Sequence, residues 1–207
     1  MPHVSEDRFL VLHGLRLRGF GEPGPIAAVV GIDEQTVHDH LAKFQAEELV
    51  LRRDGRLAGW ALTPLGRAEQ ERLAALDLAL AEARPVVQDG YERFLRSNTE
   101  LLGVCTDWQV RDGAPNDHAD AAYDASVIDR LKEIDASVAP VLDDLANALD
   151  RYGHYSPRFA AAVARLDAGE LEWFTKPLID SYHTIWFELH EDLLSTLGLE
   201  RSKEGEG

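Results

Sequence analysis

The stretch Gly24–Arg67, GPIAAVVGIDEQTVHDHLAKFQAEELVLRRDGRLAGWALTPLGR, decides the fold of this chain. A short helix is expected to begin at Pro25, because proline is favoured in a first helical turn, where its missing N–H is not needed. Gly31 and Ile32 then form a turn. Asp33 is a typical N-cap residue, whose carboxylate accepts hydrogen bonds from the free N–H groups of a first turn, so a second helix is predicted to start there.

The second helix carries an apolar stripe and is followed by a hairpin signal. Val37, Leu41 and Phe44 recur at helical spacing, which predicts that they are buried. Residues 49–53 and 57–63 are strand candidates on either side of an Asp-Gly pair, a strong short-range signal for a β-hairpin. Helix, turn, helix and hairpin in this order predict a winged helix-turn-helix, in which the hairpin is the wing.

With that stripe buried, the opposite face of the second helix is free to meet a partner. In a helix-turn-helix this face enters the major groove of double-stranded DNA, and basic side chains position the protein on the phosphate backbone. The predicted DNA-binding residues are Gln35, Thr36, His38, Asp39 and Lys43 on the helix and Arg52, Arg53 and Arg56 on the wing.

The run TVHDHLAKFQAEELVLRRDGRLAGWALTPLGRA, residues 36–68, resembles MarR-type and related bacterial winged-helix transcriptional regulators. In that family a T-V-x-x-H-L-x-x-L-x-x-x-x-L-V run precedes an L-T-x-x-G-R segment, and the resemblance covers residues 8–72. It implies base contacts from Thr36, His38 and Asp39, and phosphate or minor-groove contacts from Arg53 and Arg56.

Two positions depart from the pattern of these regulators. Asp39 stands where a basic or neutral polar residue is common, and a carboxylate can only accept hydrogen bonds, for instance from the N4 amine of cytosine. Glu48 stands where a glycine usually ends the recognition helix, so this helix is expected to end with a different geometry.

Beyond Leu65 the sequence is helical for most of its length. Apolar residues recur every seven positions from Leu73 to Leu101, which predicts one long apolar seam, and Pro85 is expected to kink or split that helix near residues 83–84. Small residues in register with the seam would let another helix approach closely. Further helices are predicted over residues 123–152, 157–166 and 171–197.

The chain is therefore predicted to be mainly α, with two domains. Residues 1–68 form the winged helix-turn-helix with its small β-hairpin. Residues 69–207 form an all-α domain for dimerisation, effector binding or both.

The last predicted helix is apolar on two faces, and such a helix is covered on both sides. The rest of the domain, a dimer partner or a ligand could each cover the second face. As an effector site the helix offers aromatic walls with a few polar groups, from Trp173, Tyr182, His183, Trp186 and His190. The simpler interpretation is an aromatic core with satisfied histidines.

The charge distribution bears on the DNA-binding hypothesis, because the net charge is −16. Residues 1–72 hold 9 Lys and Arg against 11 Asp and Glu, a balance of −2, whereas residues 73–207 hold 12 against 26, a balance of −14. The acidic side chains are expected to be mostly solvated. DNA binding is expected to depend on local cations and to be weak and sensitive to salt.

Other sequence features narrow the class of protein. Cys105 is the single cysteine and cannot form an internal disulfide, no run of eighteen apolar residues exists, and the N-terminus lacks a signal-peptide pattern, so a cytoplasmic protein is expected. The sequence contains no nucleophile elbow, phosphate-binding glycine loop or zinc-ligand spacing. No enzymatic activity, cofactor or metal is predicted.

These features predict a DNA-binding transcriptional regulator that acts as a homodimer, with a small-molecule effector as a further partner of the helical domain. The alternative is a protein-interaction module, in which the winged helix is a scaffold and the acidic helical surface meets a basic partner.

Overall fold

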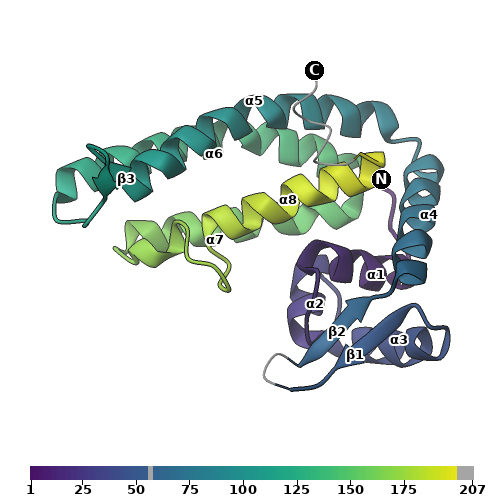
Figure 1. Cartoon of the computed structure of the whole chain (residues 1–207). Helices are drawn as coiled ribbons and strands as arrows, with labels where there is room; N and C mark the ends of the chain where they lie inside the picture. The colour runs from purple at the N-terminus through teal and green to yellow at the C-terminus, as the bar shows by residue number, and fades with distance from the viewer. Residues whose placement is uncertain (56–57, 200–207) are drawn as a thin grey trace.

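The computed structural model describes residues 1–55 and 58–199, and these residues are mainly helical (Figure 1). The first part of the chain forms a compact group, which we call the N-terminal module. Its elements are α1 (Asp7–Arg18), α2 (Pro23–Val30), α3 (Glu34–Ala46), β1 (Val50–Arg53), β2 (Gly59–Leu62) and the first turns of α4 (Pro64–Leu80). The prediction of a mainly α chain with a small antiparallel hairpin is confirmed.

Strand β2 of the hairpin forms backbone hydrogen bonds along both of its edges. β1 and β2 pair antiparallel, with Val50 opposite Leu62 and Arg53 opposite Gly59. On the other edge of β2, the backbone of Trp60 exchanges two hydrogen bonds with Gly21, at 3.0 and 2.8 Å. The hairpin is thereby fixed to the segment between α1 and α2.

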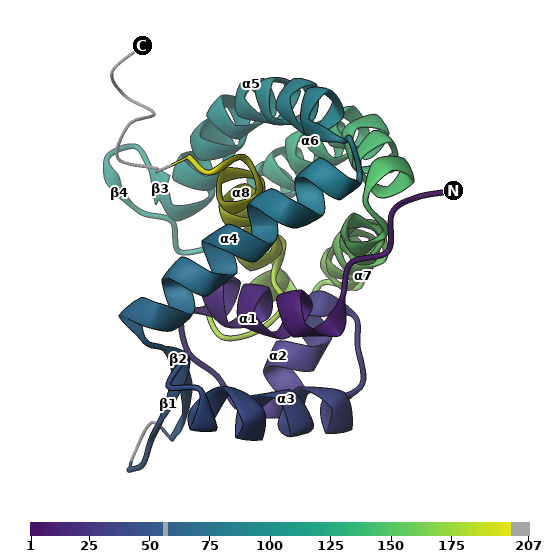
Figure 2. The same ribbon diagram turned by 90° about the vertical axis from the view of Figure 1, so that its right-hand side faces the viewer.

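The remaining elements form a second group, which we call the helical region. They are α5 (Arg84–Gln109), β3 (Val110–Arg111), β4 (Ala114–Pro115), α6 (Ala121–Ala148), the 3₁₀ helix η1 (Asp150–His154), α7 (Tyr155–Asp167), the 3₁₀ helix η2 (Leu171–Trp173) and α8 (Tyr182–Leu197). In Figures 1 and 2, α5 and α6 run side by side along one edge of this region, α7 and α8 lie on its other side, and α4 joins it to the N-terminal module.

Helix α4 contributes to two hydrophobic clusters. Leu73 and Ala74 belong to the cluster of the N-terminal module, whereas Leu78 belongs to the cluster of the helical region. The chain then breaks between α4 and α5, with Glu82 at φ +50°. The prediction that Pro85 interrupts the long helix near residues 83–84 is confirmed.

The close approach of α5 and α6 depends on the small residues of the seam. A side chain at Gly90 would meet Leu145 at 3.0 Å, and the hydroxyls of Ser97 and Ser137 lie 3.2 Å apart. The seam is interrupted at Leu80. Leu80, in the last turn of α4, is 66% exposed, although Leu73 and Val87 on either side of it in the pattern are buried.

Several predicted boundaries are wrong, including the start of α2, which lies at Pro23 and not at Pro25. The predicted helix over residues 171–197 is two elements, η2 and α8, joined by a non-helical loop over residues 174–181. Ser181 caps α8 by accepting from the Thr184 N–H at 3.4 Å, so the helix starts late. The predicted helix over 123–152 gives way to η1 after Ala148, and the polar connection after α5 contains the short β3–β4 hairpin. Within the described residues, no helix has the length and apolar character needed to cross a bilayer.

Candidate nucleic-acid interface and effector site

Helix α3 is oriented by its cap and its apolar stripe. The Asp33 carboxylate accepts from the Thr36 N–H at 2.8 Å, and hydrogen bonding by the Thr36 hydroxyl and N–H lowers the pKa of Asp33. The predicted stripe is completely buried, since Val37, Leu41 and Phe44 are at most 1% exposed. The opposite face of α3 therefore points to solvent.

The predicted residues of α3 share that outer face. Gln35, His38, Asp39 and Lys43 are exposed, and Thr36 is half-buried. The Gln35 side-chain amide donates to Asp39 Oδ1 at 2.8 Å, and His38 Nδ1 lies 3.9 Å from the same oxygen. Gln35 and Asp39 therefore present a linked amide and carboxylate to anything that meets this face.

The end of α3 differs from the expected geometry. Glu48 has φ +59°, the left-handed conformation that favours glycine, and the Leu49 N–H donates to the Phe44 carbonyl at 2.9 Å. The expectation that glutamate gives this helix a different end is wrong. Glu48 adopts the conformation that a glycine would take there.

The arginines of the β1–β2 hairpin are not equivalent. The Arg52 guanidinium lies 3.5 Å from Glu22 and 3.4 Å from Asp54, and it stacks over the Trp60 ring at 5.6 Å. Arg53 is exposed on β1 and pairs with no carboxylate of the described chain. Arg56, also predicted for the wing, lies outside the described residues. Of the hairpin arginines that the structure describes, Arg53 is therefore the one that is available to a phosphate.

Three of the five predicted effector residues line one cavity, and the other two lie outside it. An open cavity of about 400 Å³ between α5 and α8 is lined by three of the predicted residues, His183, Trp186 and His190. Trp186 is positioned by donating its indole N–H to Asn98 Oδ1 at 2.9 Å and by stacking on Phe94 at 4.7 Å. We call this space the α5–α8 cavity.

The other two predicted effector residues lie elsewhere. Tyr182 is completely buried, and its hydroxyl donates to Asp135 Oδ1 at 3.1 Å. Trp173 is on η2, where the Arg165 guanidinium lies 5.2 Å from its ring centroid. Neither residue lines the α5–α8 cavity. The separation follows from the break between η2 and α8, which removes Trp173 from the helix that carries the others.

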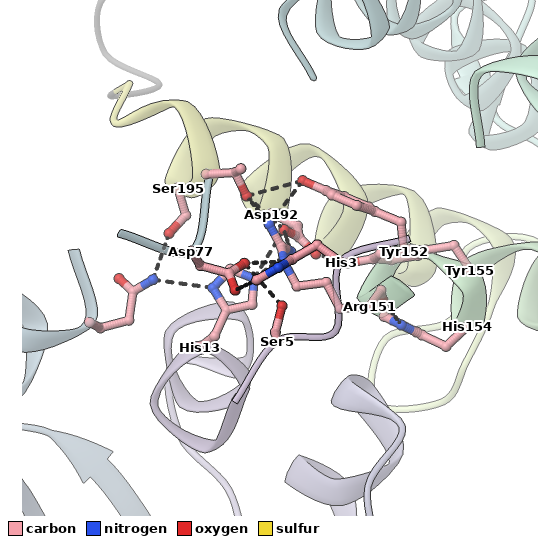
Figure 3. Close-up of polar contacts among 12 residues, drawn as sticks. His3, Ser5, His13, Asp77, Arg151, Tyr152, His154, Tyr155, Asp192 and Ser195 are labelled. Carbon is pink, nitrogen blue, oxygen red and sulfur yellow. Dashed lines mark hydrogen bonds and ion pairs between the residues drawn. The ribbon is translucent and has the colours of Figure 1, made fainter. Parts of the chain in front are cut away.

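A buried polar network joins the N-terminal module to the helical region (Figure 3). His13 Nε2 on α1 lies 3.0 Å from Asp192 Oδ1 on α8, and the Tyr155 hydroxyl donates to Asp192 Oδ2 at 3.0 Å. Arg151 on η1 forms an ion pair with the same carboxylate. Burial by itself would raise the pKa of Asp192, but Arg151 and His13 outweigh it and hold the pKa well below its usual range.

The network continues from Arg151 to α4 and the N-terminal segment. Arg151 Nε lies 3.7 Å from Asp77 Oδ2, so two carboxylates flank its guanidinium. Asp77 also accepts from the Ser5 hydroxyl at 2.9 Å and lies 2.9 Å from His3 Nε2. The N-terminal segment, α4, η1 and α8 therefore meet at one buried ion-pair cluster.

Two further ion pairs join α1 to α8. Arg16 lies 2.8 Å from Glu191, and Arg18 lies 3.1 Å from Glu188. The expectation that acidic side chains are mostly solvated is wrong for Glu188 and Asp192, which are 3% and 1% exposed. Glu188 is buried where Arg18 of α1 and Arg158 of α7 pair with it, and Asp192 is buried where Arg151 of η1 pairs with it.

No family model, curated protein or solved structure matches this chain. Among the described residues, no group of three or more His, Cys, Asp and Glu side chains is arranged to hold a metal ion. Burial raises the pKa of the Cys105 thiol to about 11, so this sulfur is protonated at neutral pH.

Proposed function

We propose that this chain is a cytoplasmic DNA-binding transcriptional regulator. Residues 1–68 act as a winged helix-turn-helix, and residues 69–207 act as a helical domain for dimerisation and effector binding. One observation carries the proposal: α3 buries its whole apolar stripe and turns a polar face outward, next to a hairpin on which Arg53 has no carboxylate partner within the described chain. This is the arrangement through which helix-turn-helix proteins read DNA.

The chemistry of the α3 face suits contact with bases. An amide such as that of Gln35 pairs with adenine N6 and N7, and a carboxylate such as that of Asp39 accepts from cytosine N4. Lys43 and Arg53 supply charge for phosphates, which sets position and affinity rather than sequence preference. Because few cations are available, one module binds weakly. A homodimer on two half-sites provides the additional contacts.

The test is a titration of the purified chain with a labelled DNA fragment from its own upstream region, followed by fluorescence anisotropy at several salt concentrations. Arg53→Ala is expected to weaken binding and to reduce the salt slope by about 1, since one phosphate contact is lost. Arg96→Ala is the matched control. Arg96 is exposed on α5, far along the chain from the hairpin, and its replacement changes the net charge equally without affecting binding.

The proposal fails if the fragment binds no better than unrelated DNA at low salt, or if Arg53→Ala and Arg96→Ala have the same effect. The alternative of a protein-interaction module is favoured by one observation, which is that Glu34 and Asp39 are both exposed on α3. A basic protein partner would then bind this face. Asp39→Lys would weaken such a partner, whereas it would strengthen non-specific DNA binding.

A further inference from the structure

A second cavity lies between the N-terminal module and α8, and we call it the junction cleft. It has a volume of about 510 Å³. Its apolar and polar lining comes from the end of α1, the segment between α1 and α2, the loop before α8 and α8 itself, principally Leu17, Phe20, Leu178, His183, Thr184 and Phe187. His183 and Phe187 also line the α5–α8 cavity, so the two spaces meet at these side chains.

The size and walls of the junction cleft are those of a small-molecule site. Ligand pockets occupy roughly 300–1,000 Å³, have mainly apolar and aromatic walls with a few polar groups, and occur preferentially where domains meet. Here Phe20 and Phe187 supply aromatic walls from the two sides. The Thr184 hydroxyl, 2.9 Å from Ser181 Oγ, and the His183 ring supply the polar groups on α8.

The charges at the cleft are already paired, which determines the class of ligand. Arg18 and Glu188, the two charged residues of the lining, form an ion pair at 3.1 Å, and Glu188 also accepts from Arg158 at 2.6 Å. Burial lowers the pKa of His183, so its ring is neutral at pH 7. An ionised ligand would find no unpaired counter-charge, whereas an uncharged ligand would lose little on leaving water.

The loop at the rim has an unusual conformation. Leu178 has φ +68°, which is strained for a leucine, and its side chain is 93% exposed. Strained residues persist where the surrounding structure fixes them, and they are concentrated at ligand clamps and switch regions. Because its side chain projects into solvent, Leu178 presents apolar surface at the mouth of the cleft.

We propose that the junction cleft binds an uncharged aromatic molecule that carries a hydrogen-bonding group, with its ring between Phe20 and Phe187 and its polar group toward His183 and Thr184. The proposal deepens the proposed function and rests on it for the role of the ligand as an effector. A molecule in the cleft touches both the N-terminal module and α8, and it lies beside the Arg18–Glu188 ion pair that joins them.

The probe for the test is N-phenyl-1-naphthylamine, an uncharged aromatic amine whose fluorescence rises in apolar sites, titrated into the full chain without DNA. Its sulfonated relative, 1-anilinonaphthalene-8-sulfonate, has the same ring system and a negative charge. We expect saturable binding of the uncharged probe with one site per chain, and at least tenfold weaker binding of the charged one. Thermal melting of each protein variant verifies that it is folded.

Three variants locate the site. Phe187→Ser is expected to weaken binding of the uncharged probe at least tenfold, because it removes one aromatic wall. Leu178→Gly suits the backbone at φ +68° and therefore keeps the fold, and it is expected to weaken binding severalfold by removing the apolar rim. Leu80→Ser is the matched control, since Leu80 is exposed on α4 outside the cleft, and it should leave binding unchanged.

The proposal is overturned if the uncharged probe does not saturate, if the sulfonate binds as tightly, or if both cleft variants bind like Leu80→Ser. It is also overturned if Phe187→Ser converts a dimer to a monomer in sedimentation while the uncharged probe fails to bind the unmodified chain, because the cleft is then an interface between copies. Because these measurements contain no DNA, a negative result overturns the ligand site alone and is independent of the result of the DNA titration.

Discussion

His13 on α1 and Asp192 on α8 lie 3.0 Å apart, and both side chains are buried, although 178 residues separate them in the sequence (192 − 13 − 1 = 178). This contact is the centre of the polar network that fixes the N-terminal module to the helical region. α8 therefore carries the charged contacts to α1 and also forms walls of the α5–α8 cavity and the junction cleft. A shift of α8 would be transmitted directly to α1.

Asp192→Asn should destabilise the protein strongly. The change keeps the shape of the side chain but removes the negative charge that lies against Arg151 and His13, so a buried cation loses its main partner. Breaking a buried ion pair in this way costs about 3–5 kcal/mol. Urea unfolding followed by circular dichroism measures the change as a lower midpoint with an unchanged slope.

Asp112→Asn is the matched control for that variant. Asp112 is 96% exposed and lies 4.0 Å from Arg111, so its ion pair is solvated and contributes little. We expect the two substitutions to differ by several kcal/mol. Equal unfolding midpoints for the two variants would show that the buried network does not hold the module in place.

The stability of the fold should fall between pH 6.5 and pH 4 because of His154. Burial, reinforced by the charge of Arg158, lowers the pKa of His154 from 6.5 to about 4. The unfolded chain therefore binds a proton in this range that the folded chain does not, and stability decreases as the pH falls. Each unit of pKa difference corresponds to about 1.4 kcal/mol, so the full effect is about 3 kcal/mol.

His154→Asn removes this titration while keeping the hydrogen bond. His154 Nδ1 lies 2.5 Å from the Arg151 carbonyl and must donate to it, and an asparagine amide can donate at the same place. Urea unfolding at pH 7.5, 6.5, 5.5 and 4.5 should show a shallower pH dependence for this variant than for the unmodified chain. His38→Asn, at an exposed position on α3, should retain the original dependence. Parallel curves for all three proteins would contradict the assignment to His154.

Local chemistry in the sequence predicted the α3 region well. The N-cap at Asp33, the stripe of Val37, Leu41 and Phe44, and the antiparallel pairing of the strands that flank the Asp-Gly pair each depend on residues that are close together in the chain, and each is confirmed. The pairing closes with Arg53 opposite Gly59, so the connection is longer than the Asp-Gly pair alone. Periodicity also explains why Trp186 and His190, four residues apart on α8, line one cavity.

The junction between the two parts could not be predicted in the same way. The local sequence around Arg151 and Asp192 is typical of surface charges, and only the contacts of η1 and α8 with His13 of α1 bury them together. The acidic run on α8, which contains Glu188, Glu191 and Asp192, is opposite basic residues on α1. No local period connects two segments so far apart in the chain, so a pairing of this kind requires the tertiary structure.

Gly66→Ala should destabilise the N-terminal module. A Cβ at this position would lie 1.9 Å from the Leu49 carbonyl oxygen, where the hairpin packs against the start of α4. The backbone would have to move, and such overpacking costs about 1–3 kcal/mol. Gly103→Ala is the control, since nothing lies within 4 Å of its Cβ position on α5, and alanine there should stabilise the helix by about 1 kcal/mol. If both variants are more stable in urea than the unmodified chain, the close approach of Gly66 to Leu49 does not limit the stability of the module.

Glu48→Gly should stabilise the protein, although glycine usually weakens a fold. At φ +59° a glutamate costs about 1–2 kcal/mol that glycine does not, whereas the greater freedom of glycine in the unfolded chain costs about 0.5–1 kcal/mol. The Glu48 carbonyl accepts from the Thr63 hydroxyl at 2.8 Å, and this backbone contact survives the substitution. The free energy of unfolding should therefore rise by about 0.5–1 kcal/mol, which is measured as a higher urea midpoint. Glu71→Gly, in the middle of α4, should lose about 1 kcal/mol instead, and a loss in both variants would show that the left-handed conformation at Glu48 carries no strain.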